Sequence, residues 1–79
     1  MTKRDKLLQK LFQNPGSLRY AQIETLLLAE GCVKVQTKGS HFHFVHGDMP
    51  YDLTIPVHNR DCKDVYKIEA MKFLKKLTS

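Results

Sequence analysis

The sequence predicts an α+β fold in the order α-α-β-β-β-α, with helices packed on one face of a three-stranded antiparallel sheet. Apolar residues recur at helical spacing near both ends of the chain. Between these segments, apolar and polar residues alternate in three short runs, 32–38, 40–45 and 51–57. At 79 residues the chain has room for one domain, residues 1–79, and its 42% hydrophobic content is typical of a globular protein.

Two helices are expected before the sheet. Thr2 to Asp5 resembles a capping box, Leu7, Leu8, Leu11 and Phe12 follow at helical spacing, and Asn14-Pro15-Gly16 ends the segment. The first helix therefore covers residues 3–13, with residues 1–16 forming an additional N-terminal element. The second covers residues 20–30, where Ile23, Leu26 and Leu27 mark the inner face and Gly31 is the expected C′ residue.

The three alternating runs predict a meander with one apolar face. Gly39 allows a tight turn between the first two runs, and Gly47 to Pro50 form a longer connection. We expect the helices to bury one alternating set: Val33, Val35, Phe42, Phe44, Leu53 and Ile55. The other face would then carry Lys34, Gln36, Lys38, His41, His43 and Thr54 and would be open and basic.

The last helix is expected to begin after Asp61, which would serve as its N-cap. Tyr66, Ala70, Phe73 and Leu77 form its predicted core stripe. Its lysines, Lys67 among them, lie off that stripe, as do Ile68 and Met71.

Charge, cysteines and hydropathy narrow the classes of function. The net charge is +5, and the excess lies at the two ends of the chain. This distribution fits a polyanionic partner such as nucleic acid and a solvated lysine-rich surface equally well. The two cysteines form no CxxC pair and are expected to be buried thiols. No apolar run is long enough for a membrane helix and no signal peptide is recognised, so a cytoplasmic location without membrane contact is expected.

The segment Lys38-Gly39-Ser40-His41-Phe42-His43-Phe44 offers the most distinctive chemistry. A histidine accepts and donates protons near neutral pH, lysines neutralise phosphate, and RNA carries its own nucleophile in the 2′-hydroxyl. Zinc binding by His41, His43 and His46 is the competing interpretation. It is disfavoured because strand parity turns His46 to the other face and no further ligand is placed to complete the site.

Residues 18 to 77 resemble the HicA toxins of bacterial type II toxin–antitoxin systems. The resemblance rests on Lys38-Gly39-Ser40-His41, the aromatic Phe44, the Thr-Ile-Pro segment at 54–56 and the order of the flanking helices. It implies a fold like the double-stranded-RNA-binding domain. It also implies an mRNA interferase, with His41 as the catalytic histidine, and a HicB-type antitoxin as protein partner.

On this basis the expected activity is that of an endoribonuclease that needs neither metal nor cofactor. His41 would be the general acid–base, with Ser40 and His43 as possible auxiliary residues and Lys34, Lys38 and Gly39 binding RNA. The chain departs from the family pattern at Phe42, where many members have a second histidine, and in its extra N-terminal helix. Two alternatives stay open: a non-catalytic RNA-binding module of the same fold, and a protein-interaction domain that uses Ile68 and Met71.

Overall fold

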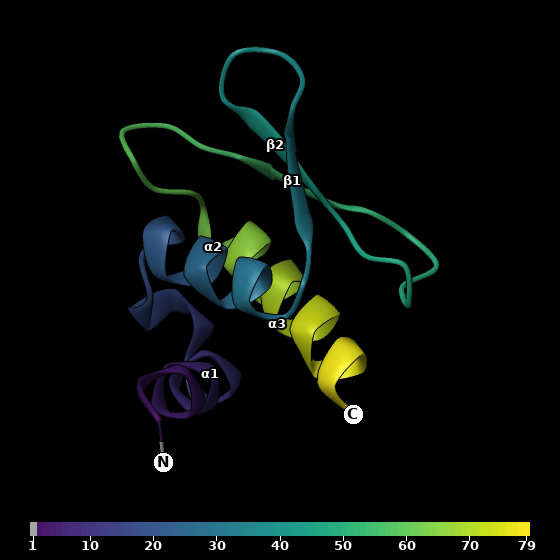
Figure 1. The fold of residues 1–79 in the computed structure, drawn as a ribbon. Helices are drawn as coiled ribbons and strands as arrows, with labels where there is room; N and C mark the ends of the chain where they lie inside the picture. Colours follow the sequence, from purple (N-terminus) through teal and green to yellow (C-terminus); the bar gives the residue numbers. More distant parts are fainter. Residues whose placement is uncertain (1) are drawn as a thin grey trace.

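The computed structural model describes residues 2–79 and has the predicted α+β architecture. The elements, in chain order, are α1 (Lys3–Gln13), a 3-10 turn (Pro15–Ser17), α2 (Tyr20–Ala29), β1 (Val33–Gln36), β2 (His41–Val45), β3 (Leu53–Pro56) and α3 (Asp64–Thr78). They form three layers, in which the sheet lies on α2 and α3, and α1 lies on the far side of these two helices (Figure 1). In residues 2–79 no helix combines the length and the apolar character that a membrane span requires.

Local sequence signals set the ends of α1 and α2. The predicted capping box is present, because Asp5 N–H donates to Thr2 Oγ1 at 3.1 Å and Thr2 N–H donates to the Asp5 carboxylate at 3.4 Å. At the end of α2, Gly31 has a φ of 89°, which confirms its predicted C′ role. Gly31 and Cys32 N–H donate back to the carbonyls of Leu28 and Leu27, so the helix ends in a Schellman motif.

The sheet has the strand order β1-β2-β3 and is antiparallel throughout, as predicted. Phe42 lies opposite Ile55, and Phe44 lies opposite Leu53, on the face that the helices cover. Phe44 and Ile55 are fully buried and share one hydrophobic cluster with Phe73 of α3. The prediction that Phe42 and Phe44 point toward the helices is therefore confirmed.

The predicted face of β1 is wrong. Lys34 lies opposite Phe44 and Gln36 lies opposite Phe42, so both polar residues of β1 point to the helix side. Val33 and Val35 point the other way, with 62% and 41% of their surface exposed. β1 is an edge strand, and only part of its inner side lies over the helices, so alternation alone does not decide which residues are buried.

Asp61 does not cap α3, contrary to the prediction. The helix begins at Asp64 with Lys63 as N-cap. Asp61 instead accepts hydrogen bonds from Tyr20 N–H, at the start of α2, at 3.0 Å, and from Cys62 N–H at 2.9 Å. Its carboxylate also lies 3.3 Å from Lys67 Nζ. Lys67 lies off the predicted core stripe, yet it is only 5% exposed, because the Asp61 carboxylate compensates its charge inside the fold.

Asp61 links stability to pH. The pKa of Asp61 lies below its ordinary value of 3.8, chiefly because its carboxylate accepts a hydrogen bond from Cys62 N–H. Hydrogen bonds from Tyr20 N–H and Lys67, and the positive charge of Lys67, lower this pKa further. A carboxyl whose pKa is lower in the folded state stabilises the fold above its unfolded pKa. That contribution is lost as the pH falls through the folded pKa. Asp61→Asn leaves the buried Lys67 ammonium without its charged partner, so we expect it to reduce the free energy of unfolding by about 1–3 kcal/mol at pH 7. The difference from wild type should shrink below about pH 4.

Urea unfolding of wild type and Asp61→Asn at neutral and acid pH measures this effect. Lys67→Met is the matched control. It should cost less, since the Asp61 side chain remains about a third exposed to water and keeps its two backbone donors. Equal stability of Asp61→Asn and wild type at pH 7 would contradict the role assigned to the pair.

Candidate functional site

The Gly-Ser-His segment forms the turn that leads into β2. His41 N–H donates to the Lys38 carbonyl at 2.9 Å, which closes a β-turn over residues 38–41. Gly39, at the second position of this turn, has a φ of 53° and no atom within 4 Å of the place a Cβ would take. Glycine is therefore required by the backbone conformation and not by lack of space. The Gln36 side-chain amide donates to the Gly39 carbonyl and fixes the turn on β1.

His41 is the first residue of β2 and is exposed. It lies opposite Pro56 of β3, and its carbonyl accepts a hydrogen bond from Thr37 N–H at 3.2 Å. Within residues 2–79, neither ring nitrogen of His41 has a hydrogen-bond partner. The backbone thus holds this residue in place while both nitrogens are free for an external ligand.

His43 lies on the same face but in a different environment. Its Nε2 lies 3.1 Å from Thr37 Oγ1, and its Nδ1 lies 2.9 Å from Thr54 Oγ1. Because each hydroxyl can donate or accept, a neutral imidazole satisfies both contacts. His43 therefore links the end of β1 to β3 across β2, and a proton transfer at its ring would require one of these bonds to break.

Lys34 does not lie beside His41, contrary to the prediction. Its ammonium group forms an ion pair with Glu24 of α2 and lies 4.2 Å from the centroid of the Phe42 ring. Glu24 also accepts a hydrogen bond from the Tyr20 hydroxyl at 2.9 Å. Lys34 thus covers the outer edge of the core, where its carbon chain packs on apolar surface and its charge is paired.

The open face, meaning the side of the sheet turned away from the helices, is not basic as expected. Its residues from the strands and their ends are Val33, Val35, Thr37, His41, His43, Val45, Thr54 and Pro56. Val33, Val35 and Val45 are at least 37% exposed and form a valine patch, in which Val33 lies opposite Val45 and Val35 opposite His43. Among the predicted lysines only Lys38 stays at this site, exposed on the turn.

Ser40 contributes through its backbone. Its carbonyl accepts a hydrogen bond from Val57 N–H at 2.9 Å, just after β3. This bond joins the turn before His41 to the segment that follows Pro56. It keeps both segments at one end of the sheet.

Neither cysteine is poised to act as a nucleophile. Burial raises the pKa of the Cys62 thiol to about 11 and also raises the pKa of Cys32. Both side chains are therefore protonated at neutral pH, and a thiol is a much weaker nucleophile than a thiolate. Both are free thiols; Cys32 is buried as predicted, but Cys62 is only partly buried.

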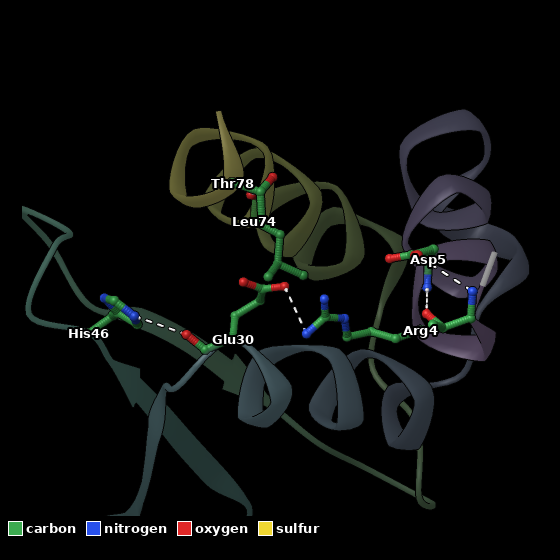
Figure 2. Close-up of polar contacts among 7 residues, drawn as sticks. Arg4, Asp5, Glu30, His46, Leu74 and Thr78 are labelled. Carbon is green, nitrogen blue, oxygen red and sulfur yellow. Dashed lines mark hydrogen bonds and ion pairs between the residues drawn. The ribbon is translucent and has the colours of Figure 1, made fainter.

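The interpretation of His41, His43 and His46 as metal ligands finds no support in residues 2–79, where no three potential ligand side chains meet. His46 has a structural position (Figure 2). Its Nε2 lies 3.0 Å from the Glu30 carbonyl at the end of α2, and its Nδ1 accepts from Asp48 N–H at 3.0 Å. The Glu30 carboxylate lies 3.9 Å from Arg4 of α1, so Glu30 is contacted from two sides.

Sequence reasoning missed a second turn at the His41 end of the sheet. His58 and Asp61 exchange backbone hydrogen bonds of 2.8 and 3.0 Å around Asn59 and Arg60. Both central residues have positive φ, 53° and 64°, as in a type I′ turn. Of the two central residues only Asn59 favours this conformation. The turn was not predicted because it lacks the glycine that usually marks a turn with positive φ.

Comparison with known proteins identifies a family to which the chain is similar. The model of the family described as HicA toxin of bacterial toxin–antitoxin matches residues 20–77, which is well over half of the chain. The matched range begins at the first residue of α2, and α1 lies outside it. Searches of curated proteins and of solved structures found no match.

Proposed function

Because the chain belongs to the HicA toxin family of bacterial toxin–antitoxin systems, we propose that it is a cytoplasmic endoribonuclease that cleaves mRNA. The observation that carries the proposal is the environment of His41. Its imidazole is exposed, has no hydrogen-bond partner within residues 2–79, and follows a hydrogen-bonded turn that carries Lys38. A group with these properties is free to meet an RNA backbone and to exchange a proton with it.

In the proposed reaction His41 accepts the proton of a ribose 2′-hydroxyl. The 2′-oxygen then attacks the adjacent phosphorus, a new P–O bond forms, and the bond to the 5′-oxygen breaks as that oxygen takes up a proton. This chemistry requires a base and an acid but no metal or cofactor, because the nucleophile belongs to the substrate. A positioned acid–base group contributes roughly 10² to 10⁴ to such a rate.

The other predicted site residues receive different roles. We propose that Lys38 and the exposed backbone at Gly39 bind the phosphate next to His41, since both lie on the same turn. Ser40 and His43 support His41 by fixing the turn and the strands around it. Lys34 could bind RNA only after releasing Glu24, so we assign it a smaller share of RNA binding than Lys38.

A HicB-type antitoxin is the proposed protein partner. The valine patch supports a contact on the open face, because three neighbouring valines there are exposed to solvent next to His43. We therefore propose that apolar contacts, more than pairing of acidic groups with lysines, hold the antitoxin over the site. An antitoxin in this position would also block access of RNA to His41.

The test of the activity is cleavage of a 5′-labelled transcript by the purified protein, with and without an excess of EDTA. We expect discrete cleavage products in both conditions and their loss when the antitoxin is added. A shift in RNA mobility without strand scission would instead support the non-catalytic RNA-binding module, and the endoribonuclease proposal would be abandoned.

RNA binding should depend steeply on salt. The chain carries a net charge of +5, and binding through phosphates releases counterions. We expect log Kd against log salt concentration to have a slope of about 0.7 for each phosphate contacted on single-stranded RNA. Fluorescence anisotropy at several salt concentrations measures the slope. A flat response would argue against RNA as the ligand.

A further inference from the structure

We propose that the second turn and the two residues after it, residues 58–63, are a further RNA-binding element, which holds single-stranded RNA beside the bond to be cleaved. Arg60 and Lys63 would bind the phosphate backbone, and His58 would stack on a neighbouring base. The proposal rests on the proposed ribonuclease function and adds to it a subsite for the neighbouring nucleotide, formed by residues other than those of the turn before His41. We call residues 58–63 the RNA-binding turn.

The backbone of this turn is under strain at Arg60. Two consecutive residues without glycine, Asn59 and Arg60, have φ values of 53° and 64°. Asparagine tolerates the left-handed region, but arginine gains nothing locally from it, and glycine would adopt it without steric cost. Strain of this kind persists where the surrounding structure enforces it, and it clusters at functional sites.

Two anchors hold the turn in a fixed position relative to His41. Val57 N–H donates to the Ser40 carbonyl at 2.9 Å, and Pro56 lies opposite His41. The turn begins two residues after Pro56, or about 7 Å along an extended chain. On its other side, Asp61 is bound by Tyr20 N–H and by Lys67 Nζ, at 3.0 and 3.3 Å. The turn and the β1–β2 connection thus leave the same end of the sheet (Figure 1).

The cations of the turn are available to a ligand. Arg60 and Lys63 are exposed, and neither forms an ion pair within the part of the chain that the structure describes. Lys34 and Lys67, in contrast, are each bound to a carboxylate. The carboxylate of Asp61 does not oppose an incoming phosphate strongly, because Lys67 and two backbone N–H groups already compensate its charge.

A pocket at the base of the turn offers a second kind of contact with RNA, namely with a base. It has a volume of about 240 Å³ and is lined by His58, Asp61, Cys62 and Lys63. Bases of single-stranded RNA are commonly bound by stacking on aromatic side chains, histidine among them. A phosphate on Arg60 and Lys63 together with a base on His58 would define the nucleotide next to the cleaved bond.

The variant Arg60→Gly tests whether Arg60 binds RNA or only contributes to the fold. Glycine relieves the strain, so we expect the thermal midpoint to rise by about 4 °C. Loss of one charged phosphate contact should weaken binding of a labelled single-stranded RNA about tenfold at low salt and reduce the salt slope by about 0.7. The background is His41→Ala, which keeps the RNA intact during the measurement.

Two further variants complete the experiment. Lys75→Gln removes one exposed positive charge from the last turn of α3 and should leave the salt slope unchanged. His58→Ala should weaken binding about fivefold, the low end of the effect of one stacked base. Opposite changes in stability and in affinity for Arg60→Gly cannot result from misfolding.

The outcomes distinguish this inference from the function on which it rests. If wild type cleaves RNA and Arg60→Gly binds it with unchanged affinity and salt slope, the RNA-binding turn is wrong and the ribonuclease proposal stands. If wild type neither binds nor cleaves RNA, both fail together. If Lys75→Gln lowers the RNA affinity and the salt slope as much as Arg60→Gly does, net charge alone sets the affinity. That result would also overturn the proposal.

Discussion

Replacing His41 with alanine is expected to reduce RNA cleavage by about 100- to 10,000-fold, which is the usual contribution of a general acid–base. The same change should alter stability by no more than about 0.5 kcal/mol, since exposed side chains without partners contribute little. His41 is exposed, and its ring makes no hydrogen bond within residues 2–79. Cleavage of a labelled transcript and a thermal melt of the same sample measure the two quantities.

His43→Ala is the matched control for this experiment. It removes an imidazole from the same strand and face, but one whose two nitrogens contact Thr37 and Thr54. We expect it to lower stability by about 1 kcal/mol through the lost hydrogen bonds and to reduce cleavage much less than His41→Ala. Folded His41→Ala protein that cleaves RNA at the wild-type rate would refute the catalytic assignment, and His43 would become the candidate.

Phe44→Ala, unlike His41→Ala, is expected to act mainly on the stability of the fold. Phe44 is completely buried between β2 and the helices, and truncation of a buried phenylalanine costs about 3–5 kcal/mol. A domain of this size has a total stability of only about 5–10 kcal/mol. We therefore expect the urea midpoint to fall by about a third or more while the slope of the unfolding transition stays the same.

Val35→Ala is the comparison within the sheet. Val35 is 41% exposed on the open face, so its truncation should change stability by about 0.5 kcal/mol or less. The comparison also checks the observed register, since the sequence predicted Val35 to lie in the core. A loss of several kcal/mol for Val35→Ala, with little effect of Phe44→Ala, would mean that the two faces of the sheet had been exchanged.

Periodicity predicted the elements well because each depends on nearby residues. The Thr2 and Asp5 cap, the Gly31 end of α2 and the burial of Phe44 follow from local spacing and from the apolar face of each element. The turn before His41 was predictable for the same reason, since Gly39 lies where a positive φ is needed.

The errors arose where long-range contacts decide the outcome. β1 alternates valine with Lys34 and Gln36, and the apolar set was assigned to the core. The register with β2 reverses that choice, because a shift of one residue exchanges the faces of a strand. Asp61 was assigned to the helix that follows it, yet it binds Tyr20, which is 41 residues away in sequence. The buried charge of Lys67 depends on that same residue and could not be found from helical spacing.

The position of α1 as a third layer has a consequence for how this protein can be prepared. Leu11 of α1 is fully buried in the same cluster as Phe73, so we propose that residues 2–16 belong to the single domain formed by residues 2–79. A shortened protein that began at Tyr20, where the family match begins, would leave that side of α2 and α3 bare. Bare apolar surface drives association with other chains. A protein truncated at the start of the family match is therefore expected to aggregate more readily than one that keeps α1.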